Sequence, residues 1–150
     1  MKILFVCTGN ICRSAMAEYQ LKEKIKDKKK KIEVASCGIQ AYNGEPATNY
    51  TIQTLKKHGI NGKNHRATNV KDANIQEADL ILCATQLHKK TMQRMFPEKQ
   101  AQIYTMKEYA YPLEKEDFDI AYPWGYDLNT YENCYIQIEK CITEIVKRIQ

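Results

Sequence analysis

The sequence lacks any apolar run that approaches the roughly 20 residues needed to cross a bilayer. Its first apolar stretch, residues 3–6, is also too short for the core of a secretory signal peptide. We therefore expect a cytoplasmic protein with no membrane partner. With 43% hydrophobic and 27% charged residues in a chain of 150, the composition is that of a globular protein, and the length favours one domain, residues 1–150.

The ligand spacings of a zinc site and the framework of a disulfide-rich protein are missing as well. The six cysteines include no Cys-x2-Cys pair, and the three histidines include no His-x3-His pair. The cysteines are also widely scattered, unlike those of small secreted proteins. We expect no bound metal. Cys134 and Cys141 lie seven residues apart in an apolar helical stripe, which indicates packing rather than chemistry.

Positive charge is in excess, but it is concentrated in one segment. The formal net charge is +5, and residues 22–31 contain seven lysines and two acidic residues. The segment begins in the last turn of a predicted helix, whose C-terminal end is stabilised by cations. Aromatic side chains, which stack on the bases of single-stranded nucleic acids, do not interleave with these lysines. We therefore interpret the segment as a solvated helix end and expect no nucleic-acid partner.

The most informative stretch is residues 7–14, Cys-Thr-Gly-Asn-Ile-Cys-Arg-Ser. It follows the apolar run 3–6, which is typical of a buried strand, and precedes residues 15–25, whose apolar side chains recur at helical spacing. The stretch is therefore a loop that leads into a helix N-terminus, where free backbone N–H groups and the helix dipole attract anions. Gly9 would allow an unusual backbone angle in such a loop.

Cys7 and Arg13 at the two ends of this loop suggest a specific chemistry. Backbone amides and the Arg13 guanidinium would stabilise the Cys7 thiolate. The same donors match the oxygens of a phosphoryl group, because arginine can bind two of them at once. A thiolate below that group could displace its leaving oxygen and form a cysteinyl-phosphate. The alternative is a buried structural cysteine beside a surface arginine.

Residues 6–14 resemble the signature of the low-molecular-weight protein tyrosine phosphatases. Segments 34–38, 57–60, 64–66 and 78–81 resemble that family too, so the likeness extends over the chain. The resemblance implies that Cys7 is the nucleophile and Arg13 the phosphate clamp. It implies that the remaining loop residues bind phosphate or a similar oxyanion: Thr8, Gly9, Asn10, Ile11, Cys12 and Ser14. It also implies that Cys7 and Cys12 can form a disulfide that protects the nucleophile from further oxidation.

The same resemblance assigns roles outside the loop. It implies that Ser36 and His65 support the loop through hydrogen bonds with Asn10 and Ser14. From residue type alone, Ser36 would be an ordinary strand-end hydroxyl and His65 a surface histidine. Tyr42 and Trp124 would form the aromatic walls of a deep cleft for phosphotyrosine, in which stacking on the indole face is favourable.

The chain alternates predicted strands with predicted helices, which indicates an α/β fold: a three-layer structure with a four-stranded parallel sheet, helices on both faces and the phosphate-binding loop after the first strand. Ligands of such sheets bind at the carboxyl ends of the strands. We predict strands at 3–6, 80–83 and 103–104, and a strand at 31–36 that ends at Gly38. We predict helices at 15–25, 48–58, 86–96 and 128–149, a short helix or helical turn at 70–77 and a helical turn at 106–109, with loops at 39–47 and 111–127. In the last helix, Leu128, Tyr131, Ile138, Ile142, Ile145 and Ile149 are predicted to be buried.

The chain departs from the family pattern at the general acid. The family has an aspartate before a proline in the last long loop, and here Tyr122 precedes Pro123. A tyrosine hydroxyl can donate a proton but, with a reference pKa near ~10, is a weaker acid than a carboxyl group. Three possibilities stay open: Tyr122 donates the proton, Asp119 or Asp117 moves in, or the chemistry is slow and the protein mainly binds phosphate.

We therefore predict a phosphatase of phosphotyrosine or small aryl phosphates, impaired by the loss of the aspartate, and a monomer. No organic cofactor is needed, because Arg13 and the loop amides supply the positive field. One alternative is an arginine-phosphate phosphatase, although in that branch of the family a threonine replaces Ile11. Another is a phosphate- or phosphopeptide-binding module without turnover. Arsenate reduction is disfavoured, because Lys90 stands where a partner cysteine for Cys83 is required.

Overall fold

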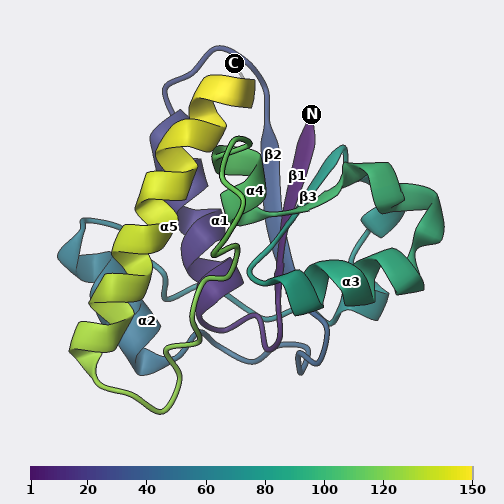
Figure 1. The fold of residues 1–150 in the computed structure, drawn as a ribbon. Helices are drawn as coiled ribbons and strands as arrows, with labels where there is room; N and C mark the ends of the chain where they lie inside the picture. Colours follow the sequence, from purple (N-terminus) through teal and green to yellow (C-terminus); the bar gives the residue numbers. More distant parts are fainter. Residues whose placement is uncertain (150) are drawn as a thin grey trace.

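In the computed structural model, which describes residues 1–149, a parallel sheet lies between two layers of helices (Figure 1). The sheet order is β2-β1-β3-β4, and every neighbouring pair is parallel. The strands are β1 (Lys2–Cys7), β2 (Glu33–Gly38), β3 (Leu80–Cys83) and β4 (Ile103–Thr105). The predicted three-layer α/β fold is therefore confirmed.

The two faces of the sheet carry separate hydrophobic clusters. One cluster joins Ile3 and Phe5 of β1 to α1 (Arg13–Ile25), α2 (Asn49–Lys57), α4 (Met106–Ala110) and α5 (Leu128–Ile149). The other joins Leu4 and Val6 to α3 (Gln86–Met95), which covers the opposite face in Figure 1. Successive side chains of a strand point to opposite faces, so a strand between two helical layers reads as a continuous apolar run.

The longest helix, α5, follows the predicted apolar stripe from Tyr131 to Ile149. Cys134 and Cys141 lie within it and are buried, as their spacing indicated. Leu128 was predicted to be buried but is 42% exposed. It is the first residue of α5, and the buried stripe begins one turn later. No helix within residues 1–149 combines the length and apolar character needed to cross a bilayer.

Several element boundaries differ from the predicted ones. The second strand begins at Glu33, two residues later than expected, and ends as predicted at Gly38, which pairs with Cys7. Residues 70–77 form two short 3-10 turns, η1 (Val70–Asp72) and η2 (Ile75–Glu77), where the sequence predicts a single helical element. The extended backbone of Ala73 separates them. After α3, Pro97 begins a further 3-10 helix, η3 (Pro97–Gln102), which the sequence pattern did not reveal.

Candidate active site

The loop of residues 7–12 lies at the carboxyl end of β1 and leads directly into α1. Threonine side chains cap the N-termini of α2, α3 and α4, whereas Cys12 at the start of α1 makes no side-chain capping bond. The first turn of α1 is also free of acidic residues. The N–H groups at this end of α1 are therefore left for an anion, which the helix dipole would attract.

Cys7 is almost completely buried at the base of this loop, with 2% of its surface exposed. Its Sγ lies 2.9 Å from the hydroxyl oxygen of Ser14, and the backbone N–H of Asn10 donates a hydrogen bond to it at 3.3 Å. Hydrogen bonds donated to a sulfur stabilise its thiolate form. The Asn10 N–H donates one, while in the contact with Ser14 either atom can be the donor.

Asn10, and not Gly9, has the left-handed backbone of the loop. Its φ is 59°, whereas the φ of Gly9 is not positive, so the expectation of an unusual angle at Gly9 was wrong. Asparagine tolerates this conformation because its short side chain can bond to nearby groups. Here Asn10 Oδ1 accepts a hydrogen bond from the backbone N–H of Thr68 at 2.9 Å.

Asn10 is also the centre of a buried hydrogen-bond network. Its Nδ2 donates to the hydroxyl oxygens of Ser14 and Ser36, both at 2.8 Å, and its carbonyl oxygen lies 2.6 Å from Nε2 of His65. The structure thus brings together the four residues that the sequence analysis grouped. It adds Glu18, whose carboxylate accepts a hydrogen bond from Ser36 at 2.5 Å. Fully bonded buried networks of this kind rigidify their surroundings.

Arg13 is the first residue of α1 and is 4% exposed. One end of its guanidinium, Nη1, donates to the carbonyl oxygen of Ile120 at 2.9 Å. Its Nε is buried and has no hydrogen-bond partner among residues 1–149. A buried, unpartnered N–H costs free energy, so this group is available for an acceptor such as a phosphate oxygen.

Tyr122 and Trp124 lie in the loop of residues 111–127. Arg13 is hydrogen-bonded to this loop at the carbonyl oxygen of Ile120. The two rings stack with centroids 6.4 Å apart, and the Tyr122 ring lies 4.8 Å from the guanidinium carbon of Arg13. Burial raises the pKa of the Tyr122 hydroxyl above its ordinary value, and the Arg13 charge partly opposes this. Tyr42 is 77% exposed and comes from the loop 39–47, which precedes α2.

Asp119 and Asp117, the two other candidates for the general acid, form contacts with residues outside the phosphate loop. Asp119 Oδ1 accepts a hydrogen bond at 2.8 Å from the backbone N–H of Gln86, at the start of α3. The carboxylate of Asp117 lies 3.2 Å from Nζ of Lys107, and its backbone is left-handed with φ 58°. The contacts of both carboxylates are thus with other residues than Arg13, whereas the ring of Tyr122 lies beside Arg13.

The other side of the loop packs against α2 and α5. Cys12 Sγ lies 3.5 Å from the hydroxyl oxygen of Tyr131 and 3.8 Å from that of Thr48. Burial raises the pKa of the Cys12 thiol. Ile11 is partly buried against the cluster on the α1 side of the sheet. All six cysteines are free thiols, and residues 1–149 contain no group of three metal-ligating side chains.

Glu18 and His88 are two site residues that the sequence analysis missed. Glu18 follows Ser14 by four residues, so a carboxylate on the buried face of α1 was a readable signal. His88 gave no such signal, because it is 80 residues from Thr8 in the sequence and only the tertiary structure brings the two side chains together.

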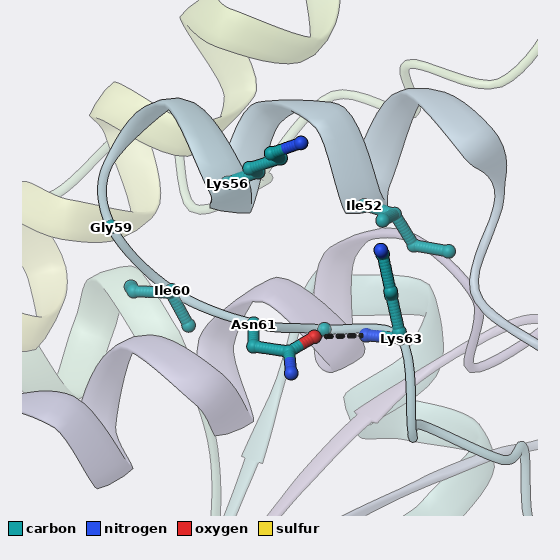
Figure 2. Close-up of a pocket in the computed structure, with 7 residues that line it drawn as sticks. Ile52, Lys56, Gly59, Ile60, Asn61 and Lys63 are labelled. Atoms are coloured by element: carbon teal, nitrogen blue, oxygen red, sulfur yellow. Dashed lines mark hydrogen bonds between the residues drawn. The ribbon is translucent and has the colours of Figure 1, made fainter.

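A separate hollow of about 300 Å³ lies beside α2 and does not include the loop (Figure 2). Gly59, Ile60 and Asn61 line one side of it. Asn61 Oδ1 accepts a hydrogen bond from the backbone N–H of Lys63. The side chains of Lys56, Asn61 and Lys63 are exposed to solvent. Exposed lysines around an open hollow do not define a ligand site, and we assign none.

A buried cysteine at the end of a parallel strand, held below an uncapped helix N-terminus beside a buried arginine, defines the class of cysteine-dependent phosphatases. The comparisons with known proteins define the family. The profile of the family "Low molecular weight phosphotyrosine protein phosphatase" matches residues 2–150. The chain therefore belongs to the low molecular weight protein tyrosine phosphatases, a family of cysteine-dependent phosphatases, as the resemblance of its loop indicated.

Individual relatives support this assignment over the full chain. A probable low molecular weight protein-tyrosine-phosphatase EpsP of Ralstonia nicotianae is 33% identical over 148 residues, which cover 99% of this chain and 95% of the relative. A protein-arginine-phosphatase of Geobacillus stearothermophilus is 34% identical over 149 residues, with 99% and 96% covered. The crystal structure of a low molecular weight protein tyrosine phosphatase from T. tengcongensis superposes with a TM-score of 0.91 at 35% identity and covers 99% of each chain.

Proposed function

We propose that the protein hydrolyses phosphotyrosine and other aryl phosphate monoesters through a covalent intermediate on Cys7. The environment of the Cys7 sulfur is the observation that supports this proposal. Ser14 Oγ lies 2.9 Å from the sulfur, the Asn10 N–H donates to it at 3.3 Å, and the guanidinium of Arg13 is buried at the other end of the loop. A phosphate in this loop would meet backbone N–H groups at the start of α1 and the free Nε of Arg13.

In the first step, the Cys7 thiolate attacks the phosphorus in line with the ester oxygen. A sulfur–phosphorus bond forms while the phosphorus–oxygen bond to the phenol breaks. The leaving oxygen takes a proton from the Tyr122 hydroxyl, and Arg13 with the loop amides stabilises the charge on the transferring group. In the second step, water attacks the phosphorus, inorganic phosphate leaves and the thiolate is restored. Tyr122, now deprotonated, accepts the proton of that water.

Tyr122 makes this phosphatase slower than one with a carboxylic acid. A tyrosine hydroxyl is protonated at neutral pH, and because burial raises the pKa of Tyr122, this hydroxyl releases its proton less readily than an ordinary tyrosine. A positioned acid is worth roughly 10²–10⁴-fold in rate. Aryl leaving groups need the least help, so the loss restricts turnover to them. Trp124 and Tyr42 provide exposed aromatic surfaces for the phenyl ring of such a substrate.

The proposal is tested with p-nitrophenyl phosphate, phosphotyrosine and phosphoserine, using wild type and Cys7→Ser. Rapid mixing should give a burst of p-nitrophenol equal to the enzyme concentration, and ³¹P NMR of the quenched reaction should detect a phosphocysteine. Cys7→Ser should lose turnover, and phosphoserine should be a poor substrate. A protein that binds phosphate but releases no phenol would instead be a binding module, and the proposal would be wrong.

Phosphoarginine is the second candidate substrate, because a relative of similar identity is named a protein-arginine-phosphatase. Ile11 is the residue of the loop that bears on this choice. A branched apolar side chain crowds a planar cation but tolerates a phenyl ring. Phosphoarginine should therefore be hydrolysed more slowly than phosphotyrosine, and Ile11→Thr should shift the ratio toward phosphoarginine. A wild type that prefers phosphoarginine would overturn the assignment to aryl phosphates.

A further inference from the structure

His88 lies in the first turn of α3, is 6% exposed and contacts the phosphate loop. Its Nε2 lies 2.7 Å from the hydroxyl oxygen of Thr8, the residue that follows the nucleophile. Its Nδ1 lies 2.9 Å from the hydroxyl oxygen of Thr85, the N-cap of α3. Both ring nitrogens are therefore bonded to hydroxyls, each of which can donate or accept.

The surroundings of His88 keep its ring neutral. Burial is the main cause that lowers its pKa, to about 4, and the charge of Arg13 lowers it further. Asp119 acts in the opposite direction but does not reverse the shift. A neutral imidazole has one donor and one acceptor nitrogen. The ring can thus form hydrogen bonds with the hydroxyls of Thr8 and Thr85 at the same time. The position of the ring proton decides whether the Thr8 hydroxyl donates or accepts in its hydrogen bond with Nε2.

His88 contacts the loop from a different element than the backbone groups that also hold it. The carbonyl oxygen of Thr8 accepts a hydrogen bond from the backbone N–H of Gln40 at 2.9 Å. The carbonyl oxygen of Ile11 accepts one from the backbone N–H of Thr48 at 3.2 Å. These groups belong to the segment between β2 and α2. The ring of His88 comes instead from α3, on the other face of the sheet (Figure 1).

The same turn of α3 also contacts the loop that carries Tyr122. The backbone N–H of Gln86 donates to Asp119, and the carbonyl oxygen of Ala84, just before α3, accepts from the N–H of Ile120. Ile120 in turn accepts a hydrogen bond from Arg13. The start of α3 is thus bonded to both loops that would surround a bound phosphoryl group.

We infer that His88 is a positioning residue, which fixes the Thr8 hydroxyl and with it the start of the phosphate loop relative to the Tyr122 loop. This inference rests on the proposed function, since the geometry that it fixes is that of the transferring phosphoryl group. Small displacements of a loop that surrounds a transition state lower kcat more than they weaken ground-state binding. The effect of His88 should therefore fall on kcat.

A double-mutant cycle between positions 8 and 88 tests this inference. Thr8→Val removes the hydroxyl at nearly constant shape, and His88→Leu removes both ring nitrogens. Each should lower kcat for p-nitrophenyl phosphate by about tenfold with little change in KM, and the double variant should lose hardly more than either single one. Thr8→Ser keeps the hydroxyl and should therefore lose less kcat than Thr8→Val. Thr143→Val, at an exposed position of α5, is the matched control for the loss of a threonine hydroxyl.

A spectroscopic arm makes the test independent of turnover. The ¹⁵N shifts of the His88 ring should change in Thr8→Val and stay as in wild type in Thr8→Ser and Thr143→Val. Additive losses of kcat in the cycle, or ring shifts unaffected by Thr8→Val, would overturn the inference. A wild type without turnover would overturn the proposed function instead, and the NMR arm would still report whether Thr8 and His88 are bonded.

Discussion

The guanidinium carbon of Arg13 lies 4.8 Å from the centroid of the Tyr122 ring. A cation over an aromatic face is attracted by the electrons of the ring. The residue that we propose as the proton donor therefore contacts, through its ring, the arginine that we propose as the phosphate clamp. An aspartate could not make this contact. In this proposal Tyr122 differs from an aspartate both as a proton donor and in the way in which it contacts Arg13, and the two effects can be separated by substitution.

Tyr122→Asp should restore the stronger acid and raise kcat for phenyl phosphate, with its poor leaving group, by about tenfold or more. The gain should be smaller for p-nitrophenyl phosphate, which needs less protonation. Tyr122→Phe keeps the ring over Arg13 but removes the proton, so it should lower kcat for phenyl phosphate. Steady-state kinetics with both substrates check this. If Tyr122→Asp brings no gain while Asp119→Asn abolishes turnover, Asp119 is the acid instead.

Asp119 should contribute to stability rather than to proton transfer. Its carboxylate accepts the first N–H of α3 and lies at the positive end of that helix. Loss of such a cap costs roughly 0.5–2 kcal/mol. We expect Asp119→Asn to lower the free energy of unfolding by about 0.5 kcal/mol, because the amide oxygen still accepts, and to leave kcat within about twofold. Urea titration and steady-state kinetics on the same samples check both values.

Much of this site could be predicted because its parts are close in sequence. The strand, loop and helix of residues 3–25 are encoded by an apolar run, an eight-residue signature and a helical repeat. Their outcome differs in one detail: the left-handed residue is Asn10 instead of Gly9. Glycine is the default for that conformation. Here hydrogen bonds of the Asn10 side chain to Ser14, Ser36 and the Thr68 N–H stabilise the left-handed conformation without a glycine. Ser36 and Thr68 are distant in sequence, so these bonds could not be predicted.

The parts that could not be predicted depend on tertiary contacts. His88 is seen from sequence as one polar residue in a polar helix, and only the parallel order β1-β3 brings α3 beside the loop. The two 3-10 turns of residues 70–77 have the same cause. Val70 and Ile75 both pack into the hydrophobic cluster on the α3 side of the sheet, and the extended backbone of Ala73 lies between the two turns.

The low pKa of His88 should make the protein lose stability in acid. The unfolded chain binds a proton on this ring below its ordinary value of 6.5, whereas the folded chain does so only near 4. Between these values the unfolded state binds more protons, so stability rises with pH and falls as pH is lowered through this window. The full difference is about 3 kcal/mol.

Urea titrations of wild type and His88→Gln at pH 7 and pH 4.5 check this dependence. The variant should lose less stability between the two pH values, because glutamine does not titrate. Arg13 and Asp119 are the charged groups that act on the ring. Equal losses in wild type and His88→Gln would show that other groups cause the acid sensitivity.

Gly38, rather than the glycine of the loop itself, should be the glycine on which the loop depends most. A Cβ at Gly38 would lie 2.5 Å from the carbonyl oxygen of Thr8 and 2.9 Å from the backbone nitrogen of Asn10, so the backbone would have to move. A Cβ at Gly9 would meet nothing closer than 3.5 Å, the side chain of Ile11. Gly38→Ala should therefore destabilise the fold by about 1–3 kcal/mol and lower kcat by more than tenfold.

Gly9→Ala, the matched control, should unfold at nearly the wild-type urea concentration. A Gly38→Ala protein with wild-type stability and kcat would mean that the end of β2 does not set the position of the loop.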